Sequence, residues 1–182
     1  MKKTLLLTLS ILISVSIYGM GDKVKNPGHS KDSYNNVQVP SPKQTLIGTT
    51  SPDFMFTSLD GTNHTLSDYK GKKIILDFWA TWCPPCVAEI PHFIALQNDY
   101  PDVQVIGISV DQGSATQVVQ DFMVDKNINY PVAMGNETII AKFGKIKSIP
   151  TTFLIDENFI IKQKAVGYKN KEFFEQHLNL QK

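Results

Sequence analysis

Residues 74–91 read IILDFWATWCPPCVAEIP, and this stretch decides the fold. Four apolar residues surround Asp77, which predicts a short strand buried on both faces. A helical pattern begins at Cys83, and Cys83 and Cys86 are the only two cysteines of the chain. A helix N-terminus presents unpaired N–H groups and a partial positive charge, which favour a thiolate over a thiol. The spacing therefore predicts a redox-active pair, with Cys83 exposed at the capping position and Cys86 one turn further on.

This stretch resembles the active-site strand and turn of thioredoxins, first in Asp77–Ala80 and then in Trp82–Cys86. Glu89 and Pro91, which follow the cysteines, are similar to residues of the TlpA/ResA-like branch of that superfamily. Members of this branch are thiol–disulfide oxidoreductases on the outer side of the bacterial inner membrane. The similarity extends from about Ser51 to the C-terminus.

The resemblance implies a role for each residue of this site. Cys83 would be the attacking thiolate, and Cys86 would resolve the mixed disulfide by attacking back. Asp77 would assist proton transfer to and from Cys86, and a carboxyl on a buried strand is expected to have a raised pKa. Glu89 would tune the thiol pKa or contact substrate, and Trp82 would offer a surface platform for substrate. The plainer alternatives are a solvated Asp77 at a strand edge and a Glu89 on an exposed helix face.

A second motif, Ser148–Asp156, resembles the family segment in which a cis-proline faces the cysteine pair. Proline is the residue whose cis peptide bond costs little, so we expect Ile149–Pro150 to be cis. The N–H and C=O of Ile149 would then pair with an extended substrate as a neighbouring strand does.

The predicted fold class is α/β, with a central mixed β-sheet flanked by helices as in thioredoxin. An N-terminal β-hairpin turning at Asp60–Gly61 precedes the central strand. A helix and a short strand are inserted before Pro150. Both additions suit the TlpA-like branch better than plain thioredoxin.

The chain has 182 residues, is 42% hydrophobic and carries a net charge of +1, which suits one ordinary domain and gives no electrostatic case for nucleic acid. Residues 1–20 predict a signal peptide or an N-terminal membrane anchor, because two lysines precede a short apolar run. Residues 21–46 are polar and proline-containing and predict a flexible linker. The thioredoxin-like domain is expected over 47–182. Either interpretation of the N-terminus exports the domain to the periplasm or the outer face of the inner membrane.

Rival functions fit the residues less well. A peroxiredoxin-type peroxidase needs a threonine three residues before its cysteine and an arginine, whereas Thr81 is two residues before Cys83 and the chain has no arginine. A copper(I)-binding chaperone of this fold would use the same cysteine pair. Zinc would need four ligands, and none of the four histidines has ligand spacing to the pair. We expect no resident metal and no cofactor.

The expected activity is therefore reduction of protein disulfides, with a disulfide-donating oxidase and the copper(I) chaperone as alternatives. A reductase in an oxidising compartment needs electrons from across the membrane. The resemblance implies a membrane thiol-relay donor of the DsbD/CcdA kind. The client would be apocytochrome c during cytochrome c maturation, or another oxidised protein. The residues leave open the direction of electron flow, the client, the fate of the N-terminus and the oligomeric state.

Overall fold

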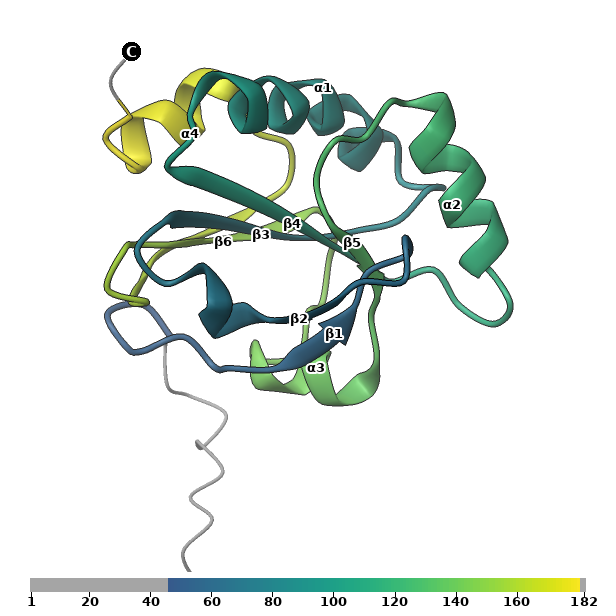
Figure 1. Cartoon of the computed structure of the whole chain (residues 1–182), viewed down its shortest axis with the longest axis horizontal. Coiled ribbons are helices and arrows are strands. Elements are labelled where there is room, and N and C mark those ends of the chain that lie inside the picture. The colour runs from purple at the N-terminus through teal and green to yellow at the C-terminus, as the bar shows by residue number, and fades with distance from the viewer. Residues whose placement is uncertain (1–45, 181–182) are drawn as a thin grey trace, which may run out of the picture. The chain divides into compact units, whose positions relative to one another are not determined.

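The structure is a computed structural model that describes residues 46–180 (Figure 1). The predicted signal peptide or anchor and almost all of the predicted linker lie outside the described residues. Seven strands, four α-helices and one 3₁₀-helix follow one another within that range. In chain order they are β1 Met55–Thr57, β2 Asn63–Thr65, the 3₁₀-helix Leu66–Tyr69, β3 Lys73–Trp79, α1 Pro84–Asp99, β4 Val103–Ser109, α2 Thr116–Asp125, β5 Val132–Met134, α3 Glu137–Lys142, β6 Thr151–Ile155, β7 Ile161–Val166 and α4 Lys171–His177.

Five of the strands form one mixed sheet in the order β5-β4-β3-β6-β7. The central strand β3 pairs in parallel with β4 and antiparallel with β6. The register aligns Trp79 with Ser109 and Asp77 with Thr152. The chain therefore leaves β3 and β4 at the same edge of the sheet, which is where the cysteine turn follows β3.

Side chains of β3 point alternately to the two faces of the sheet, because successive residues of a strand face opposite ways. Ile75 and Trp79 pack into one hydrophobic cluster, which also contains both cysteines and the apolar side of α1. Ile74, Leu76 and Phe78 pack into a second cluster on the other face. Asp77 shares its strand face with Ile75 and Trp79, so the sequence alternation places its carboxyl on the α1 side.

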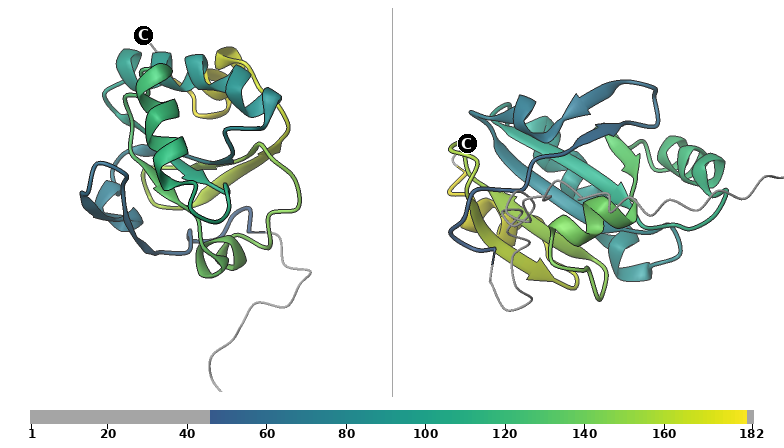
Figure 2. Two further views of the ribbon diagram at one scale, coloured as in Figure 1. Left: turned by 90° about the vertical axis from the view of Figure 1, so that its right-hand side faces the viewer. Right: turned by 90° about the horizontal axis from the view of Figure 1, so that it is seen from below.

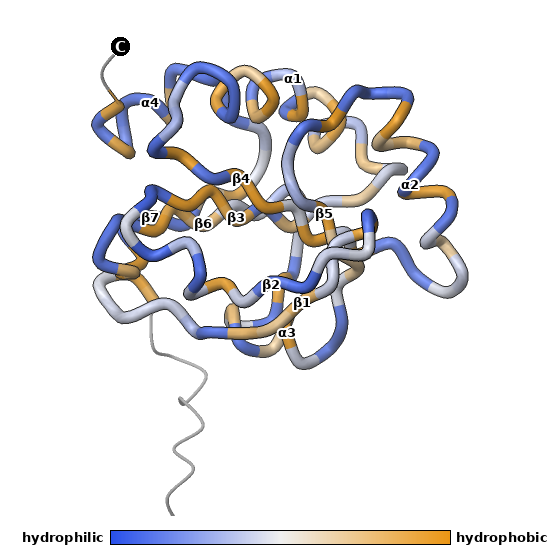
Figure 3. The backbone as a smooth tube through the Cα atoms, in the orientation of Figure 1, coloured by the Kyte–Doolittle hydropathy of each residue, from blue (hydrophilic) through white to orange (hydrophobic). Residues whose placement is uncertain are grey.

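Helices α1 and α4 cover one face of the sheet, while the β1–β2 hairpin and α3 cover the other (Figure 1). The left-hand view of Figure 2 shows the same layers from another side. The strands between these layers are largely hydrophobic, as their orange colour shows (Figure 3). None of the helices within residues 46–180 has the length and apolar character needed to cross a membrane.

The α/β class and the thioredoxin-like arrangement expected from the sequence are confirmed, including the N-terminal hairpin and the insertion before Pro150. The Ile149–Pro150 peptide bond is cis, as expected. β7 begins at Ile161, and Phe159 has a positive φ of 66° in the preceding turn. α4 ends at His177, and Asn179 has a positive φ of 50° just beyond it.

Candidate active site

Cys83 and Cys86 form a disulfide at the start of α1. Cys83 is the N-cap residue of the helix, and its Sγ accepts a hydrogen bond from the backbone N–H of Cys86 at 3.3 Å. Pro84 occupies the first helical position, where a missing N–H costs nothing. The helix N-terminus thus donates a backbone hydrogen bond to the sulfur that the sequence assigned as nucleophile.

Cys83 was expected to be exposed, and that expectation is wrong for the disulfide form, because only 4% of the residue is exposed. The bond to Cys86 ties its sulfur to a buried partner in the hydrophobic cluster beneath the helix. Exposed residues flank it instead, namely Pro84, Pro85 and Trp82, which is 67% exposed. Trp82 is a surface aromatic, as predicted.

Asp77 is buried on β3, so the alternative of a solvated aspartate at a strand edge is wrong. Its Oδ1 accepts one hydrogen bond from the hydroxyl of Thr152 at 3.1 Å. Burial raises the pKa of Asp77 well above its usual range, the negative charge of Glu89 raises it further, and the Thr152 hydrogen bond partly opposes both. A carboxyl in this state holds its proton to a higher pH than an exposed aspartate does.

Glu89 is fully buried on the inner side of α1, which overturns the alternative of an exposed helix-face glutamate. Its Oε1 accepts a hydrogen bond of 2.6 Å from the backbone N–H of Lys169, in the segment between β7 and α4. Its Oε2 is buried and has no partner within residues 46–180. Burial raises the pKa of Glu89 to about 7, although the Lys169 backbone and side chain act in the opposite direction. The buried carboxyl of Glu89 therefore titrates near neutrality, and its charge acts on Asp77.

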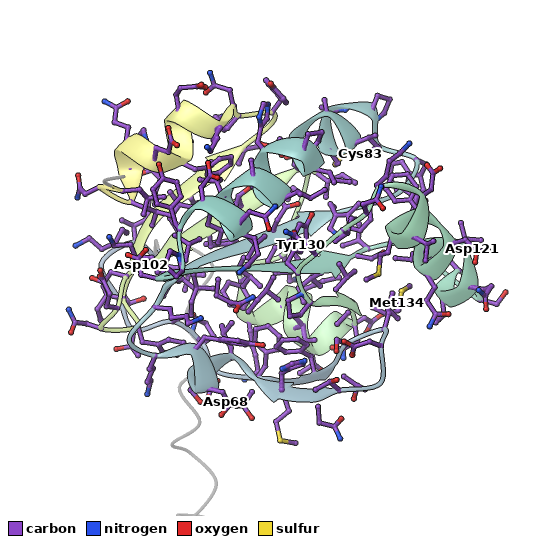
Figure 4. The ribbon with its side chains drawn as sticks, turned by 45° about the horizontal axis from the view of Figure 1, so that its top comes forward. Asp68, Cys83, Asp102, Asp121, Tyr130 and Met134 are labelled. Atoms are coloured by element: carbon purple, nitrogen blue, oxygen red, sulfur yellow. A yellow bond between two sulfur atoms is a disulfide. The ribbon has the colours of Figure 1, made fainter. Side chains whose placement is uncertain are left out.

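Tyr130 is a further member of this buried group, and no motif in the sequence points to it. Figure 4 shows its side chain beneath α1, and the ring of Phe93 meets it edge-on. Burial raises the pKa of Tyr130 well above its usual value, and the charges of Asp77 and Glu89 add to the effect. The phenol therefore stays protonated beside the two carboxyls, where its hydroxyl is a neutral dipole.

Asp111 is the second residue that sequence reasoning missed. It is buried just beyond β4, and one of its oxygens accepts hydrogen bonds from the Thr81 backbone N–H at 3.0 Å and the Ser109 hydroxyl at 2.7 Å. The other oxygen accepts from the Thr81 hydroxyl at 2.7 Å. Thr81 lies two residues before Cys83. Asp111 thus fixes the turn that delivers Cys83 to the helix start.

The cis peptide of Ile149–Pro150 is hydrogen-bonded to the segment that follows β7. The carbonyl of Pro150 accepts a hydrogen bond from the N–H of Gly167 at 2.9 Å. Two residues on, Lys169 binds Glu89, so one short segment contacts both the proline and the buried carboxyl. Ile149 itself is half-buried and lines a groove together with Trp82. The two predicted substrate-contact residues therefore share one surface.

The geometry suits thiol–disulfide exchange. A thiolate at Cys83 would be stabilised by the helix N-terminus, and Cys86 lies one turn behind it. The carboxyls of Asp77 and Glu89 lie on the same side of the sheet, and both have raised pKa values that suit proton transfer. Over the described part of the chain, no three His, Cys, Asp or Glu side chains come together in a way that would hold a metal ion.

Comparison with known proteins places this site in a family. The AhpC/TSA family matches residues 47–164. The chain is 37% identical over 132 residues to the thiol-disulfide oxidoreductase ResA of Geobacillus kaustophilus, covering 72% of this chain and 76% of that protein. It is 34% identical over 151 residues to the thioredoxin-like protein YneN of Bacillus subtilis, covering 81% and 88% of the two chains.

A solved structure agrees with these relatives. The crystal structure of a thioredoxin-family thiol:disulfide interchange protein from Chlorobium tepidum superposes with a TM-score of 0.68 at 31% identity, covering 75% of this chain and 97% of that one. The ResA relative is named a thiol-disulfide oxidoreductase, and the disulfide at the start of α1 is the group that this reaction requires. The chain belongs to the AhpC/TSA family and, within it, to the ResA-like thiol–disulfide oxidoreductases with a thioredoxin fold.

Proposed function

We propose that this oxidoreductase is exported and works as a reductase of protein disulfides. The proposal rests on the disulfide between Cys83, which caps α1, and Cys86. Two carboxyls with raised pKa values lie on the same side of the sheet as this disulfide. Residues 1–20, with their signal-like pattern, support export to the periplasm or the outer face of the inner membrane.

The proposed reaction transfers two electrons from the dithiol to a client disulfide. The Cys83 thiolate attacks one client sulfur, forming a mixed disulfide and releasing the other client sulfur as a thiolate. Cys86 then loses its proton to Asp77 and attacks Cys83. The client sulfur that was bonded to Cys83 leaves as a thiolate, both client thiolates take up protons, and the enzyme is left with the Cys83–Cys86 disulfide. The reduced protein is regenerated by a dithiol donor.

The donor we propose is a membrane thiol relay of the DsbD/CcdA type, because an oxidising compartment supplies no reducing equivalents of its own. The proposed clients are oxidised proteins outside the cytoplasm, with apocytochrome c in cytochrome c maturation as one of them. Trp82 and the backbone of Ile149 would hold the client segment beside the disulfide. An N-terminal tether would keep the enzyme close to its donor.

Trapping of clients by a Cys86→Ser variant tests the proposal. Without the resolving thiol, the mixed disulfide through Cys83 should accumulate, and it should disappear on treatment with dithiothreitol. Cys83→Ser is the matched control and should trap nothing. The trapping should be confined to protein outside the cytoplasm, as shown by cell fractionation.

The redox state of the wild-type protein in a bacterial host shows the direction of electron flow between enzyme and client. A reductase should be mostly reduced when a DsbD-type relay is present and should accumulate as the disulfide when the relay is deleted. A protein that stays oxidised in both strains, while its clients gain disulfides, would be a disulfide-donating oxidase and would contradict the proposal.

A further inference from the structure

A groove of about 820 Å³ opens beside the disulfide. It lies between the end of the cysteine turn, the segment after β4, the start of α3 and the segment that leads into the cis-proline. Half-buried apolar side chains line its floor, namely Val110, Ile140 and Ile146. Trp82 and Ile149 line it at the active-site end.

The groove is continuous with the place where a client must bind. Trp82 immediately precedes Cys83, and Ile149 immediately precedes the cis-proline. A client chain that pairs with the backbone of Ile149 and presents its sulfur to Cys83 therefore continues into the groove on one side. An extended chain spans roughly 3.3 Å per residue, so a few residues flanking the client cysteine fit within it.

One lysine, Lys147, lines the groove. Lys142 and Lys145 precede Lys147 in the same segment and do not belong to the lining. All three are exposed, and none makes an ion pair with a carboxylate of residues 46–180. The sequence has no acidic residue between Glu137 and Asp156, although the whole chain is nearly neutral at +1.

Two acidic residues, Asp111 and Glu137, also line the groove, and neither forms an ion pair with these lysines. Asp111 is buried and its oxygens already accept hydrogen bonds from Thr81 and Ser109. Glu137 is exposed, but it lies in the first turn of α3, at the opposite end of that helix from Lys142. The stretch from Lys142 to the cis-proline therefore carries three lysines and no acidic residue, and its last part, residues 146–149, lines the groove.

We propose that this groove selects clients in which the segment beside the cysteine is extended and acidic, with apolar side chains to cover the floor. The inference rests on the proposed function, because it takes the disulfide as the reacting group. Unpaired lysines beside a binding site attract segments of opposite charge and speed their association, and they disfavour basic segments. Acidic polypeptide is preferred over an anionic lipid surface as the ligand because the lysines adjoin a groove that leads to the reacting sulfur.

The test uses two synthetic peptide substrates with the same disulfide and the same apolar residues, one with Asp and Glu flanks and one with Lys flanks. kcat/KM for their reduction is measured at low salt for three proteins. These are the wild type, Lys142→Gln/Lys145→Gln/Lys147→Gln, and the matched control Lys70→Gln/Lys72→Gln/Lys162→Gln. The control removes the same charge at the opposite edge of the sheet, where β3 begins and β6 ends.

We expect the wild type and the control to prefer the acidic peptide by about 10-fold, a size typical of electrostatic steering. The preference should fall to about 2-fold or less in the triple variant, and also in the wild type at high salt, because salt screens exposed charges. Equal rates for both peptides in the wild type would overturn the proposal. So would an equal loss of preference in the control, which would assign the effect to net charge.

Direct binding separates this inference from the proposed function. Fluorescence anisotropy of the labelled acidic peptide, measured with Cys83→Ser protein, reports the groove without any redox reaction. Tight binding of the acidic peptide with no reduction of either peptide by the wild type would contradict the reductase function and support the preference of the groove for acidic segments. Reduction of both peptides without any charge preference in rate or binding would support the reductase function and overturn the proposed preference. Lysine-dependent binding to phosphatidylglycerol vesicles, with no preference between the peptides, would show that the surface contacts lipid and would overturn the proposal.

Discussion

The buried acidic side chains of the active site fall into two regions that differ in how they are hydrogen-bonded. Asp111 accepts three hydrogen bonds, two from Thr81 and one from Ser109, at 2.7 to 3.0 Å. Asp77 accepts one from Thr152, and Glu89 accepts one from Lys169 and leaves an oxygen buried without a partner among residues 46–180. Asp111 has a structural role, because a carboxylate that accepts several hydrogen bonds fixes the positions of the groups that donate them.

The second region is built to exchange protons. Few donors stabilise the negative charge there, so burial dominates and raises the pKa of both Asp77 and Glu89. Asp111 and Asp77 therefore have different roles near the same disulfide, the first structural and the second in proton transfer. What distinguishes the two regions is the number of donors around each carboxyl, which the depth of burial does not reveal.

The largest expected effect comes from removing the well-bonded carboxyl. Asp111→Ala leaves two donors of Thr81 and one of Ser109 without their acceptor, so we expect the free energy of unfolding to fall by about 4 kcal/mol. Urea titration measures this change. Asp121→Ala is the control, because exposed Asp121 accepts one hydrogen bond from Gln117 and its loss should cost less than about 0.5 kcal/mol. A similarly small loss for Asp111→Ala would refute its scaffolding role.

The next largest effect is a pH dependence of stability that arises from Glu89. Its pKa is raised from 4.5 to about 7 in the folded protein, so the folded state holds a proton that the unfolded state has already lost in that range. Stability is therefore fully present below pH 4.5 and is lost as the pH rises through about 7. The loss is about 3 kcal/mol for this shift.

Glu89→Gln isolates that contribution, because the amide can still accept the Lys169 hydrogen bond but cannot ionise. Urea titrations from pH 4 to 8 should show wild-type stability falling more steeply with pH than that of the variant. Asp77 also has a raised pKa and contributes in the same direction, and because the charge of Glu89 adds to that shift, the difference between the two proteins reports Glu89 together with its effect on Asp77. Parallel curves for the two proteins would show that the pKa of Glu89 is the same in the folded and unfolded states, and would contradict the raised pKa.

Asp77→Asn should affect the rate rather than the fold. The variant keeps an acceptor for Thr152 but cannot take the proton of Cys86, so we expect the resolving step to slow about 100-fold at neutral pH, within the range of general-base catalysis. Stopped-flow measurement of mixed-disulfide decay gives that rate. Thermal unfolding should show no loss of stability, because the substitution removes a buried ionisable group. An unchanged decay rate would remove Asp77 from the reaction.

Thr152→Val should have the smallest effect. It removes the one hydroxyl that stabilises the Asp77 carboxylate, so the pKa of Asp77 should rise further. The pH profile of mixed-disulfide decay should shift to higher pH by a few tenths of a unit or more, since one hydrogen bond contributes about 1 kcal/mol. A shift in the opposite direction would mean that Thr152 does not donate to the ionised form.

Part of this site could be predicted from the sequence because its signals are local. The buried strand before the cysteines, the helix that begins at Cys83 and the cis-proline at Pro150 each belong to a short motif, and all three are found in the structure. The contact between Asp111 and Thr81 needs the strand register. Once Trp79 is aligned with Ser109, both residues lie two positions beyond the same pair.

The burial of Glu89 had no local signal. Its partner Lys169 lies 80 residues further along the chain, and a glutamate on a helix next to alanine reads equally well as surface. Tyr130 was missed for the same reason, since its proximity to the two carboxyls exists only after folding. The accessibility of Cys83 was overestimated because the helix cap fixes its backbone position, whereas its disulfide partner decides where the sulfur packs.

The reduction potential of the Cys83–Cys86 couple is the most direct test of a reductive role. Equilibration of the purified protein against dithiothreitol or glutathione buffers gives the value. We predict about −250 mV or lower, near thioredoxin, which suits a dithiol fed by a membrane relay. A value near −120 mV, roughly that of the strong oxidant DsbA, would contradict the reductase and make this site a disulfide donor.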